Sequence, residues 1–318
     1  MIVCKCPLRI SLAGGSSDLE EFIEAHGYGA VISFTSNLYV YTTLFCDKNG
    51  YNKNLNNYIV SYTKEEKSKN IKSINNDVAR ECLIEIPTPP VKISFNAEIF
   101  SNGSGLAASS AYTAALIKSL NLFNNKNLSD LEICETALRV ERKFNPLTGR
   151  QDPYGCGIAG LKKLEFFSDN NLVHPLQDDI FKKFNMHLIY TGVKRKSTKV
   201  LKSVDLKKVE KLLDTVELME SCIKYNKVDD FLNLINEGWQ HKKQTSPLVV
   251  DDLSLRELDS KLDKNKKILT HRLCGAGGGG YFLSFSSKED DPLEVFENFD
   301  NHIIPINIDS SGISYAHL

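Results

Sequence analysis

The chain has 318 residues, of which 42% are hydrophobic and 25% are charged, and its formal net charge is -1. A chain of this length has room for about two domains, each with a substantial core. The balanced charge gives no support for nucleic acid or an anionic membrane as a bulk partner, although it leaves local basic patches open.

The opening segment, MIVCKCPLRISLAGG, does not have the pattern of a secretory signal peptide, because Lys5 and Arg9 interrupt its apolar run. No stretch of the sequence approaches the roughly 18 apolar residues of a membrane span. The 8 Cys residues are scattered and include no CxxC pair, so we expect buried reduced thiols rather than a disulfide framework or a zinc site. These features predict a cytoplasmic protein without a membrane partner.

Two strands are predicted in the first third of the chain. Residues 30–46, AVISFTSNLYVYTTLFC, are rich in β-branched and aromatic residues, and residues 91–100, VKISFNAEIF, alternate between apolar and polar side chains. Between them, residues 64–77 are charged and only weakly periodic. This intervening segment is therefore predicted to be a loop or an exposed helix.

A loop of small residues follows the second strand. Residues 101–111, SNGSGLAASSA, lead into YTAALIKSLNLF, which has helical character. Small residues let the backbone approach an anion closely, and the N-terminus of a helix presents free N–H groups to the same place. Ser109 and Ser110 add two hydroxyls for a phosphate oxygen or a magnesium ion. The segment is a candidate phosphate site, although close helix packing also explains it and the chain has no GxxxxGK[ST] loop.

The next helix carries a clear start signal and one notable carboxylate. Ser129 and Glu132 fit a capping box, and Asn145-Pro146 is predicted to end the helix. Glu141 lies near that end. It is either a solvated surface carboxylate or a hard oxygen ligand for magnesium.

Asp152 follows in a segment, Thr148–Gly155, that is rich in Gly and Pro, so we expect no regular structure there. An Asp in such a loop usually forms a turn. The alternative is a carboxylate that orients an attacking hydroxyl and accepts its proton.

The second half of the chain mixes strands and helices without regular alternation. We predict strands at 163–173 and 186–192 and amphipathic helices at 206–225, 228–243 and 251–262. This order favours an α+β fold with a domain boundary near 165–185. A glycine run, Cys274–Tyr281, follows. Such a run is costly in chain entropy and marks either close approach of the backbone to another group or a flexible hinge or tight turn.

These segments, taken with Pro7–Asp18, resemble the motifs of the GHMP kinase superfamily, which includes galactokinase, homoserine kinase, mevalonate kinase and phosphomevalonate kinase. Pro7–Asp18 is similar to the first motif, Ser104–Ala111 to the phosphate loop and Gly275–Gly280 to the third motif. The resemblance implies an α+β fold of two domains. Residues 1–175 would form an ATP-binding domain like domain 2 of ribosomal protein S5, and residues 176–318 a ferredoxin-like α/β-plait domain.

Within the superfamily the chain is most similar to the D-glycero-D-manno-heptose 7-phosphate kinases. The matching segments are Pro7–Ser11 with Gly14-Gly15, Gly149–Asp152, Tyr190–Gly192 with Arg195, Glu237–Trp239 with Lys242-Lys243, and Cys274–Gly280. The resemblance implies ATP and Mg²⁺ as cofactors and a sugar or sugar phosphate as acceptor. In this branch the acceptor group is the anomeric hydroxyl of the heptose 7-phosphate.

The resemblance also implies roles for individual residues. Asp152 would be the catalytic carboxylate, Arg9 would lie beside the reacting hydroxyl, and Ser109 and Glu141 would bind magnesium. The nucleotide would be bound by Gly103, Ser104, Gly105, Leu106, Ala107, Ala108, Ser109 and Ser110. The acceptor would be bound by Gly14, Gly15, Asp18, Arg195, Gly277 and Gly278. Arg195 would contact a distal phosphate, unless 194–199 is only a solvated loop.

The phosphate loop departs from its relatives, because Ala107 and Ala108 replace the usual Gly and Ser. Backbone N–H donors survive both changes, so we expect weaker or altered nucleotide binding. A catalytically dead sensor of sugar and nucleotide is the rival from another class, and the joint presence of Glu141 and Asp152 argues against it. Kinases for another sugar or for a mevalonate-type alcohol remain open, as does a homodimer.

Overall fold

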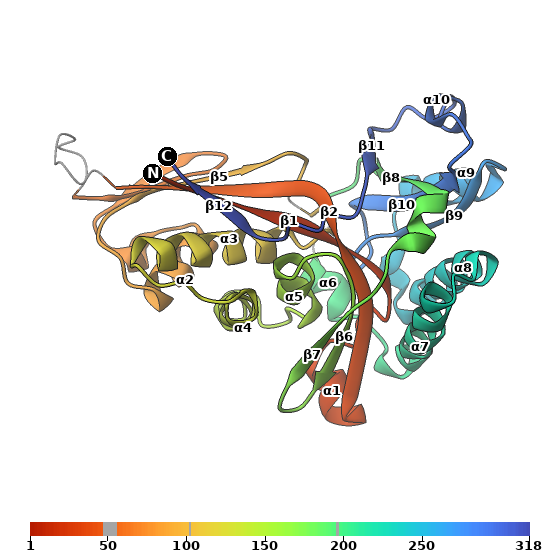
Figure 1. Ribbon diagram of the computed structural model, residues 1–318, viewed down its shortest axis with the longest axis horizontal. Coiled ribbons are helices and arrows are strands. Elements are labelled where there is room, and N and C mark those ends of the chain that lie inside the picture. Colours follow the sequence, from red (N-terminus) through yellow and green to blue (C-terminus); the bar gives the residue numbers. More distant parts are fainter. Residues whose placement is uncertain (47–55, 102, 195–196) are drawn as a thin grey trace.

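The computed structural model describes residues 1–46, 56–101, 103–194 and 197–318. In these residues the chain forms an eight-stranded sheet and a four-stranded sheet, at opposite ends of an elongated molecule (Figure 1). The elements of the first part are β1 (Ile2–Ala13), α1 (Glu20–His26), β2 (Tyr28–Phe45), β3 (Tyr58–Ser61), β4 (Glu65–Ser68), η1 (Ile71–Ser73), α2 (Asp77–Glu85), β5 (Lys92–Ala97), α3 (Ala108–Phe123), α4 (Asp130–Glu141), α5 (Gln151–Gly157), β6 (Leu161–Phe167) and β7 (Asn171–Pro175).

The remaining elements belong mainly to the second sheet and its helices. They are η2 (Asp179–Lys183), β8 (Phe184–Tyr190), α6 (Ser197–Leu201), η3 (Leu206–Lys208), α7 (Glu210–Lys224), α8 (Val228–Thr245), η4 (Pro247–Val249), α9 (Leu253–Lys264), β9 (Ile268–Leu273), β10 (Tyr281–Ser287), α10 (Pro292–Val295), β11 (Ile303–Ile306) and β12 (Ser314–His317). The mixture of two sheets with many helices confirms the predicted α+β class.

The first sheet is organised around the long antiparallel pair of β1 and β2. Residues 40–45 of β2 pair with β5, whereas residues 28–34 pair with β6. Side chains 38–45 alternate between buried and more exposed positions, but residues 29–36 are all buried, because α5 and α7 both contact this strand. The strands predicted at 30–46 and 91–100 are therefore confirmed, with small shifts at their ends.

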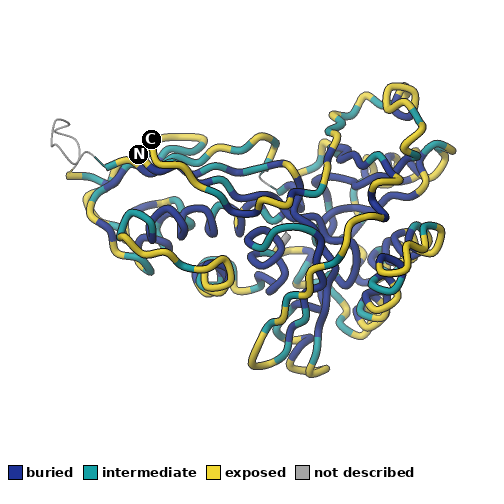
Figure 2. Tube along the Cα trace, viewed as in Figure 1, coloured by how far each residue is buried: buried dark blue, intermediate teal, exposed yellow. Residues whose placement is uncertain are grey.

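Helix α3 lies in the core between the first sheet and its other helices (Figures 1 and 2). It contacts β1, β2, α2, α4 and α5, and most of its side chains are buried. Small residues such as Ala111 and Ala115 allow this close packing. The neighbouring α4 begins with the predicted capping box, in which Ser129 and Glu132 each satisfy the other's backbone N–H.

The second sheet has the strand order β11-β8-β10-β9, and each neighbouring pair is antiparallel. Helices α7 and α8 pack on each other, and α8 and α9 contact β9. Their apolar stripes meet the sheet around Trp239 and Phe282, which are fully buried in a separate hydrophobic cluster. The helices predicted at 206–225, 228–243 and 251–262 correspond to α7, α8 and α9.

Three predictions of local structure were wrong. Residues 163–173, predicted to be one strand, belong to the antiparallel pair β6 and β7. Residues 151–157 form the helix α5, although this segment is rich in Gly and Pro. Pro153 lies in the first turn of the helix, where backbone N–H groups have no acceptor within the helix. The missing N–H of proline therefore costs no helical hydrogen bond there. Residues 65–68, predicted to be loop or exposed helix, form the strand β4 in a hairpin with β3.

The chain passes from the first sheet to the second between Pro175 and Phe184, and the domain boundary at 175/176 stays a prediction. Residues 314–317, which were predicted in the second domain, return to pair with β1. The two termini lie side by side, and the amino group of Met1 donates a hydrogen bond of 2.7 Å to the carbonyl of Leu318 (Figure 1). Among the described residues, no helix is long and apolar enough to cross a membrane.

Candidate active site

A cavity of about 920 Å³ contains the main candidate site. Its walls come from β1 and the loop after it, the segment 103–110, the end of α4, the start of α5, and the C-terminal elements α6, α8 and β9. Arg9, Glu141 and Asp152 all line it. The fold thus brings together three residues to which the family resemblance gave roles in one reaction.

The phosphate loop has a backbone that suits an anion. Gly103, Gly105 and Ala107 have φ angles of 71°, 86° and 59°, so the loop winds through left-handed conformations before α3 begins. No side chain caps the N-terminus of α3, so its first N–H groups are not satisfied by a capping side chain. These donors, at the edge of the cavity, fit the phosphates of a nucleotide. Every predicted nucleotide-binding residue in the described part of this loop lines the cavity except Leu106, which is buried in the core.

The glycine run packs directly on this loop. A Cβ atom on Gly105 would lie 2.6 Å from the carbonyl oxygen of Cys274, and one on Gly280 would lie 2.2 Å from the carbonyl oxygen of Ser104. Both positions therefore require glycine. The run is a site of close backbone approach, which was one of the two alternatives considered for it, and its contact partner is the phosphate loop.

Arg9 and Asp152 form an ion pair in the cavity wall. Nε and Nη2 of Arg9 donate to Oδ1 of Asp152 at 3.0 and 2.6 Å, and Nη1 donates to the carbonyl of Gly105 at 2.7 Å. The Arg9 side chain is 3% exposed and that of Asp152 is 27% exposed. Within the described residues no hydrogen bond reaches Oδ2 of Asp152. The guanidinium therefore holds the carboxylate in place and connects it to the phosphate loop.

Glu141 is buried rather than solvated, which rules out the surface-carboxylate alternative. Burial raises the pKa of its carboxyl to about 7, while a hydrogen bond from Ser110 opposes this rise and the charge of Asp152 adds to it. The hydroxyl of Ser110 donates to Oε2 of Glu141. Ser109, the predicted magnesium ligand, is the exposed neighbour and also lines the cavity.

This donor set fits a magnesium ion. Carboxylate and hydroxyl oxygens are the ligands that Mg²⁺ prefers. Among the described residues no cationic side chain forms an ion pair with Glu141, and burial raises the pKa of its carboxyl. A divalent cation held by Glu141 with Ser109 or Ser110 would supply the missing charge.

Asp18 is 1% exposed and contacts Gln151, the residue before Asp152. Its carboxylate accepts hydrogen bonds from Nε2 and the backbone N–H of Gln151, at 2.7 and 3.1 Å, and from the N–H of Ser16 at 3.2 Å. Burial raises the pKa of Asp18, and the nearby charge of Asp152 raises it further. A Cβ atom on Gly149 would lie 1.9 Å from Oδ2 of Asp18, which explains the glycine. Asp18 lines the cavity, as a residue that binds the acceptor would.

Of the other residues predicted to bind the acceptor sugar, some line the cavity and others do not. Gly15 lines the cavity, whereas a Cβ on Gly14 would lie 2.0 Å from the carbonyl oxygen of Ala30, so Gly14 serves close packing. Gly277 and Gly278 are not among the residues that line the cavity, and both contact Val249. Arg195 lies outside the described residues. The acceptor contacts of these residues stay predictions.

Sequence reasoning gave no role to two residues that line the cavity, and it missed one contact. Lys242 and Arg272 both line the wall formed by the C-terminal elements. Ser110, predicted to bind the nucleotide, donates its hydroxyl to Glu141. Lys242 was noted only as part of a matching segment. Arg272 lies two positions before the start of the glycine run at Cys274, and this proximity to a motif was the available signal.

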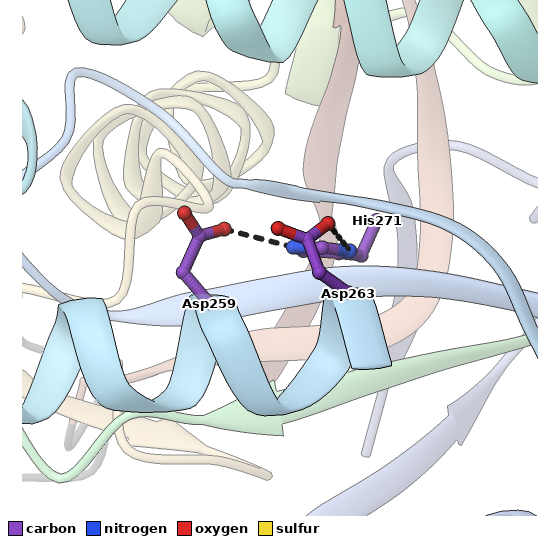
Figure 3. Close-up of side chains that lie close together, drawn as sticks. All are labelled: Asp259, Asp263 and His271. Atoms are coloured by element: carbon purple, nitrogen blue, oxygen red, sulfur yellow. Dashed lines mark hydrogen bonds and ion pairs between the residues drawn. The ribbon is translucent and has the colours of Figure 1, made fainter. Parts of the chain in front are cut away.

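A second polar cluster lies outside the cavity, between α9 and β9 (Figure 3). Nε2 of His271 lies 2.8 Å from Oδ1 of Asp259, and Nδ1 lies 3.8 Å from Oδ1 of Asp263. Asp259 also accepts hydrogen bonds from Trp239 at 2.7 Å and from Lys243 at 3.0 Å. The cluster is therefore a hydrogen-bonded network that joins α8 and α9 to β9, and it explains why Trp239 and Lys243 occur together.

Part of the chain matches a known family model and two curated proteins. Residues 70–160 match the family model for the GHMP kinases N terminal domain. A curated relative, the L-fucokinase/L-fucose-1-P guanylyltransferase of Bacteroides fragilis, is 28% identical over 214 residues, which cover 61% of this chain and 22% of that protein. The chain spans only about a fifth of the length of the curated relatives it matches.

Solved structures match over nearly the whole chain. A D-glycero-D-manno-heptose 1-phosphate kinase from Bacteroides thetaiotaomicron has a TM-score of 0.78 and 19% identity, and the match covers 100% of this chain and 99% of that one. The galactokinase of Lactococcus lactis, solved with galactose, has a TM-score of 0.75 and 14% identity, covering 98% and 95%. The fold is thus that of the two-domain GHMP kinases, and residues 70–160 match the N-terminal domain model of that family.

Proposed function

We propose that this protein is an ATP-dependent kinase that transfers the γ-phosphoryl group to a hydroxyl of a sugar or sugar phosphate. The observation that carries the proposal is the Arg9–Asp152 ion pair, which joins a carboxylate to the phosphate loop inside one cavity. A phosphoryl-transfer site needs a positioned carboxylate, anion-binding N–H groups and positive charge within a few ångströms. This cavity offers all three.

The phosphate loop and the N-terminus of α3 would hold the β- and γ-phosphates of ATP. Glu141 and Ser109 would hold Mg²⁺, and Ser110 keeps the Glu141 carboxylate in place through its hydrogen bond. A bound magnesium ion neutralises phosphate charge. Arg9 adds a fixed positive charge next to the loop. Magnesium dependence and a cytoplasmic location belong to this proposal.

Asp152 would act on the acceptor hydroxyl. Its Oδ1 is held by Arg9, so Oδ2 is the oxygen that can accept the proton of the hydroxyl. The hydroxyl oxygen then forms a bond to the γ-phosphorus, and the bond from that phosphorus to the β–γ bridging oxygen breaks. The products are a phosphate ester and ADP, and the proton leaves from Asp152 to solvent.

For the acceptor we propose the anomeric hydroxyl of D-glycero-D-manno-heptose 7-phosphate. The matching segments of that branch and the similarity to a solved heptose phosphate kinase support this choice. The curated relatives support a rival, since they are fucokinases and their names point to an unphosphorylated 6-deoxysugar. Mevalonate-type alcohols are a third option, because a mevalonate kinase has the same fold with a TM-score of 0.74.

The deciding experiment is ADP release from ATP and Mg²⁺ over a panel of acceptors. The panel contains the heptose 7-phosphate, fucose, galactose and mevalonate, each with wild type and with Asp152→Asn. We expect acceptor-dependent ADP release that requires Asp152 and is greatest with the heptose 7-phosphate. A catalytically dead sensor would bind nucleotide or sugar but release no ADP with any of these acceptors.

A further inference from the structure

Helix α5 carries Asp152 in its first turn, and its start is held by a distant residue. The first N–H groups of a helix have no acceptor within the helix, and the side chain of Arg150, the residue before α5, makes no capping hydrogen bond. Asp18, 133 positions before Gln151, binds two of these groups. Its carbonyl accepts the N–H of Arg150 at 3.1 Å, and its Oδ2 accepts the N–H of Gln151 at 3.1 Å. The loop after β1 therefore caps the helix that holds Asp152.

The carboxylate of Asp18 is enclosed by protein groups. Its Oδ1 accepts hydrogen bonds from Nε2 of Gln151 at 2.7 Å and from the N–H of Ser16 at 3.2 Å. Its Oδ2 faces Gly149, where a Cβ atom would lie only 1.9 Å away. Asp18 as a whole is 1% exposed, so a sugar hydroxyl would have to displace one of these groups to reach its carboxylate. Asp152 differs, because its side chain is 27% exposed and no hydrogen bond reaches its Oδ2 within the described residues.

A second contact holds the same end of α5. Nε and Nη2 of Arg150 donate to the two carboxylate oxygens of Glu20, which begins α1. The short segment from Asp18 to Glu20 thus binds the start of α5 through both backbone and side chains. Arg9 separately holds Oδ1 of Asp152. The backbone and the carboxylate of Asp152 are therefore fixed by different parts of the chain.

We propose that Asp18 is a positioning residue, which places Asp152 by capping α5, and that it is not a ligand of the acceptor sugar. A place in the cavity wall fits either role. The hydrogen bonds favour positioning, because two of the three donors to the carboxylate belong to Gln151, the neighbour of Asp152. Phosphoryl transfer depends strongly on alignment of the reacting groups. This inference rests on the proposed function, because it concerns the carboxylate that would act on the acceptor hydroxyl.

Asp18→Asn tests the inference at nearly constant side-chain volume. An amide has one acceptor oxygen, and its NH2 group would face at least one of the N–H donors that bind the carboxylate, so the cap is weakened. Asp252→Asn is the matched control, because Asp252 caps α9 through the N–H groups of Ser254 and Leu255 and is not among the described residues that line the cavity. Each substitution is also made in Asp152→Asn protein.

Three measurements separate the two roles. Hydrogen exchange followed by mass spectrometry reports the protection of the amides in α5. Calorimetry with D-glycero-D-manno-heptose 7-phosphate and with fucose gives the Kd of the acceptor without ATP, and ADP release gives kcat. Melting curves check that each variant is folded. If Asp18→Asn does not fold, Gln151→Met replaces it with the same expectations, since it removes the Nε2 donor and leaves the backbone cap.

We expect Asp18→Asn to speed hydrogen exchange in α5 and to lower kcat about 10- to 100-fold, since a small misplacement of a reacting group has an effect of this size. The Kd of the acceptor should change little. In Asp152→Asn protein the same substitution should lower kcat no further, because a residue that only places Asp152 has no effect once Asp152 cannot take a proton. Asp252→Asn should speed exchange in α9 and leave kcat unchanged.

Other outcomes overturn the inference. A weaker Kd for the acceptor with unchanged exchange in α5 would make Asp18 a ligand of the sugar. An equal fall in kcat with and without the Asp152 carboxylate would indicate a general loss of structure instead of positioning. If wild type releases no ADP with any acceptor, the proposed function fails, while hydrogen exchange in Asp18→Asn still decides whether Asp18 caps α5. The two failures are therefore distinct.

Discussion

Arg9 binds Asp152 through two nitrogens that share a single carboxylate oxygen, Oδ1, at 3.0 and 2.6 Å. An amide oxygen can accept the same two hydrogen bonds, so Asp152→Asn should preserve the position of the side chain. The substitution removes the ability to take a proton and also the negative charge that pairs with Arg9, so a melting curve must show that the variant is folded before its rate is interpreted.

We expect Asp152→Asn to lower kcat by roughly two to four decades, the usual contribution of a proton-transfer group. Nucleotide affinity should change little, because the phosphate loop is untouched. Steady-state ADP release with the preferred acceptor, together with a melting curve, measures both. Near-normal turnover in a folded Asp152→Asn protein would remove Asp152 from the chemical step.

Glu141 predicts a pH-dependent loss of stability in the absence of metal. Its pKa is raised from 4.5 to about 7 by burial, so between these pH values the folded protein binds more protons than the unfolded chain. The contribution of this group to stability is complete below pH 4.5 and is lost as the pH rises through 7. The loss amounts to about 3 kcal/mol by the free energy of one pKa unit.

Glu141→Gln stays neutral and should escape this loss. In EDTA at pH 8 we expect its melting temperature to exceed that of wild type by roughly 5 °C, and the difference should shrink to near zero at pH 4.5. Magnesium should raise the melting temperature of wild type at pH 8 but not that of the variant. Parallel melting curves across the pH range would show that Glu141 is not the group responsible.

We expect alanine substitutions of Ser109 and Ser110 to have different effects, one on magnesium dependence and the other on stability. Ser109 is exposed to the cavity, so Ser109→Ala should raise the Mg²⁺ concentration needed for half activity with little change in stability. Ser110 is buried against Glu141, and Ser110→Ala should lower the free energy of unfolding by about 1–3 kcal/mol by removing a hydrogen bond to a buried group. Magnesium titrations and denaturant melts measure the two effects. The reverse pattern would make Ser110 the principal metal ligand.

The Asp259 network should matter for stability rather than for catalysis. Asp259→Ala removes the acceptor of Trp239, Lys243 and His271, and the loss of one partner from a buried charged network costs about 3–5 kcal/mol. Asp263→Ala is the matched control, because Asp263 is 54% exposed and 3.8 Å from His271. We expect a large drop in melting temperature only for Asp259→Ala. Stabilisation of wild type by added zinc would instead identify the cluster as a metal site.

Local patterns predicted much of this site and failed where distant parts of the chain meet. The loop before α3 and the capping box of α4 could be inferred because their signals lie within a few residues. The burial of Glu141 against Ser110 could not, since both helices look ordinary when taken alone. Lys242 reaches Ser16 across 226 positions in the chain, a contact that only the assembled fold creates. Helix α5 was missed because its Gly and Pro residues are typical of loops. A proline such as Pro153 is nevertheless tolerated in the first turn of a helix.

Ala107 offers the last prediction, since the structure gives a physical cost to its methyl group. The residue has φ 59° and ψ 38°, a left-handed conformation that costs a non-glycine residue roughly 1–2 kcal/mol. Ala107→Gly should therefore stabilise the folded loop by about 1 kcal/mol after the extra chain entropy of glycine is subtracted. We also expect ATP to bind a few-fold more tightly, because glycine would let the backbone of this cavity-lining loop approach a phosphate more closely. Ala108→Gly is the matched control: Ala108 begins α3 in a normal helical conformation, so glycine there should destabilise. If the left-handed conformation of residue 107 carries this cost, the melting temperature should rise in Ala107→Gly and fall in Ala108→Gly, and nucleotide titrations of both variants measure the effect on ATP affinity. Equal destabilisation by both substitutions would contradict this explanation.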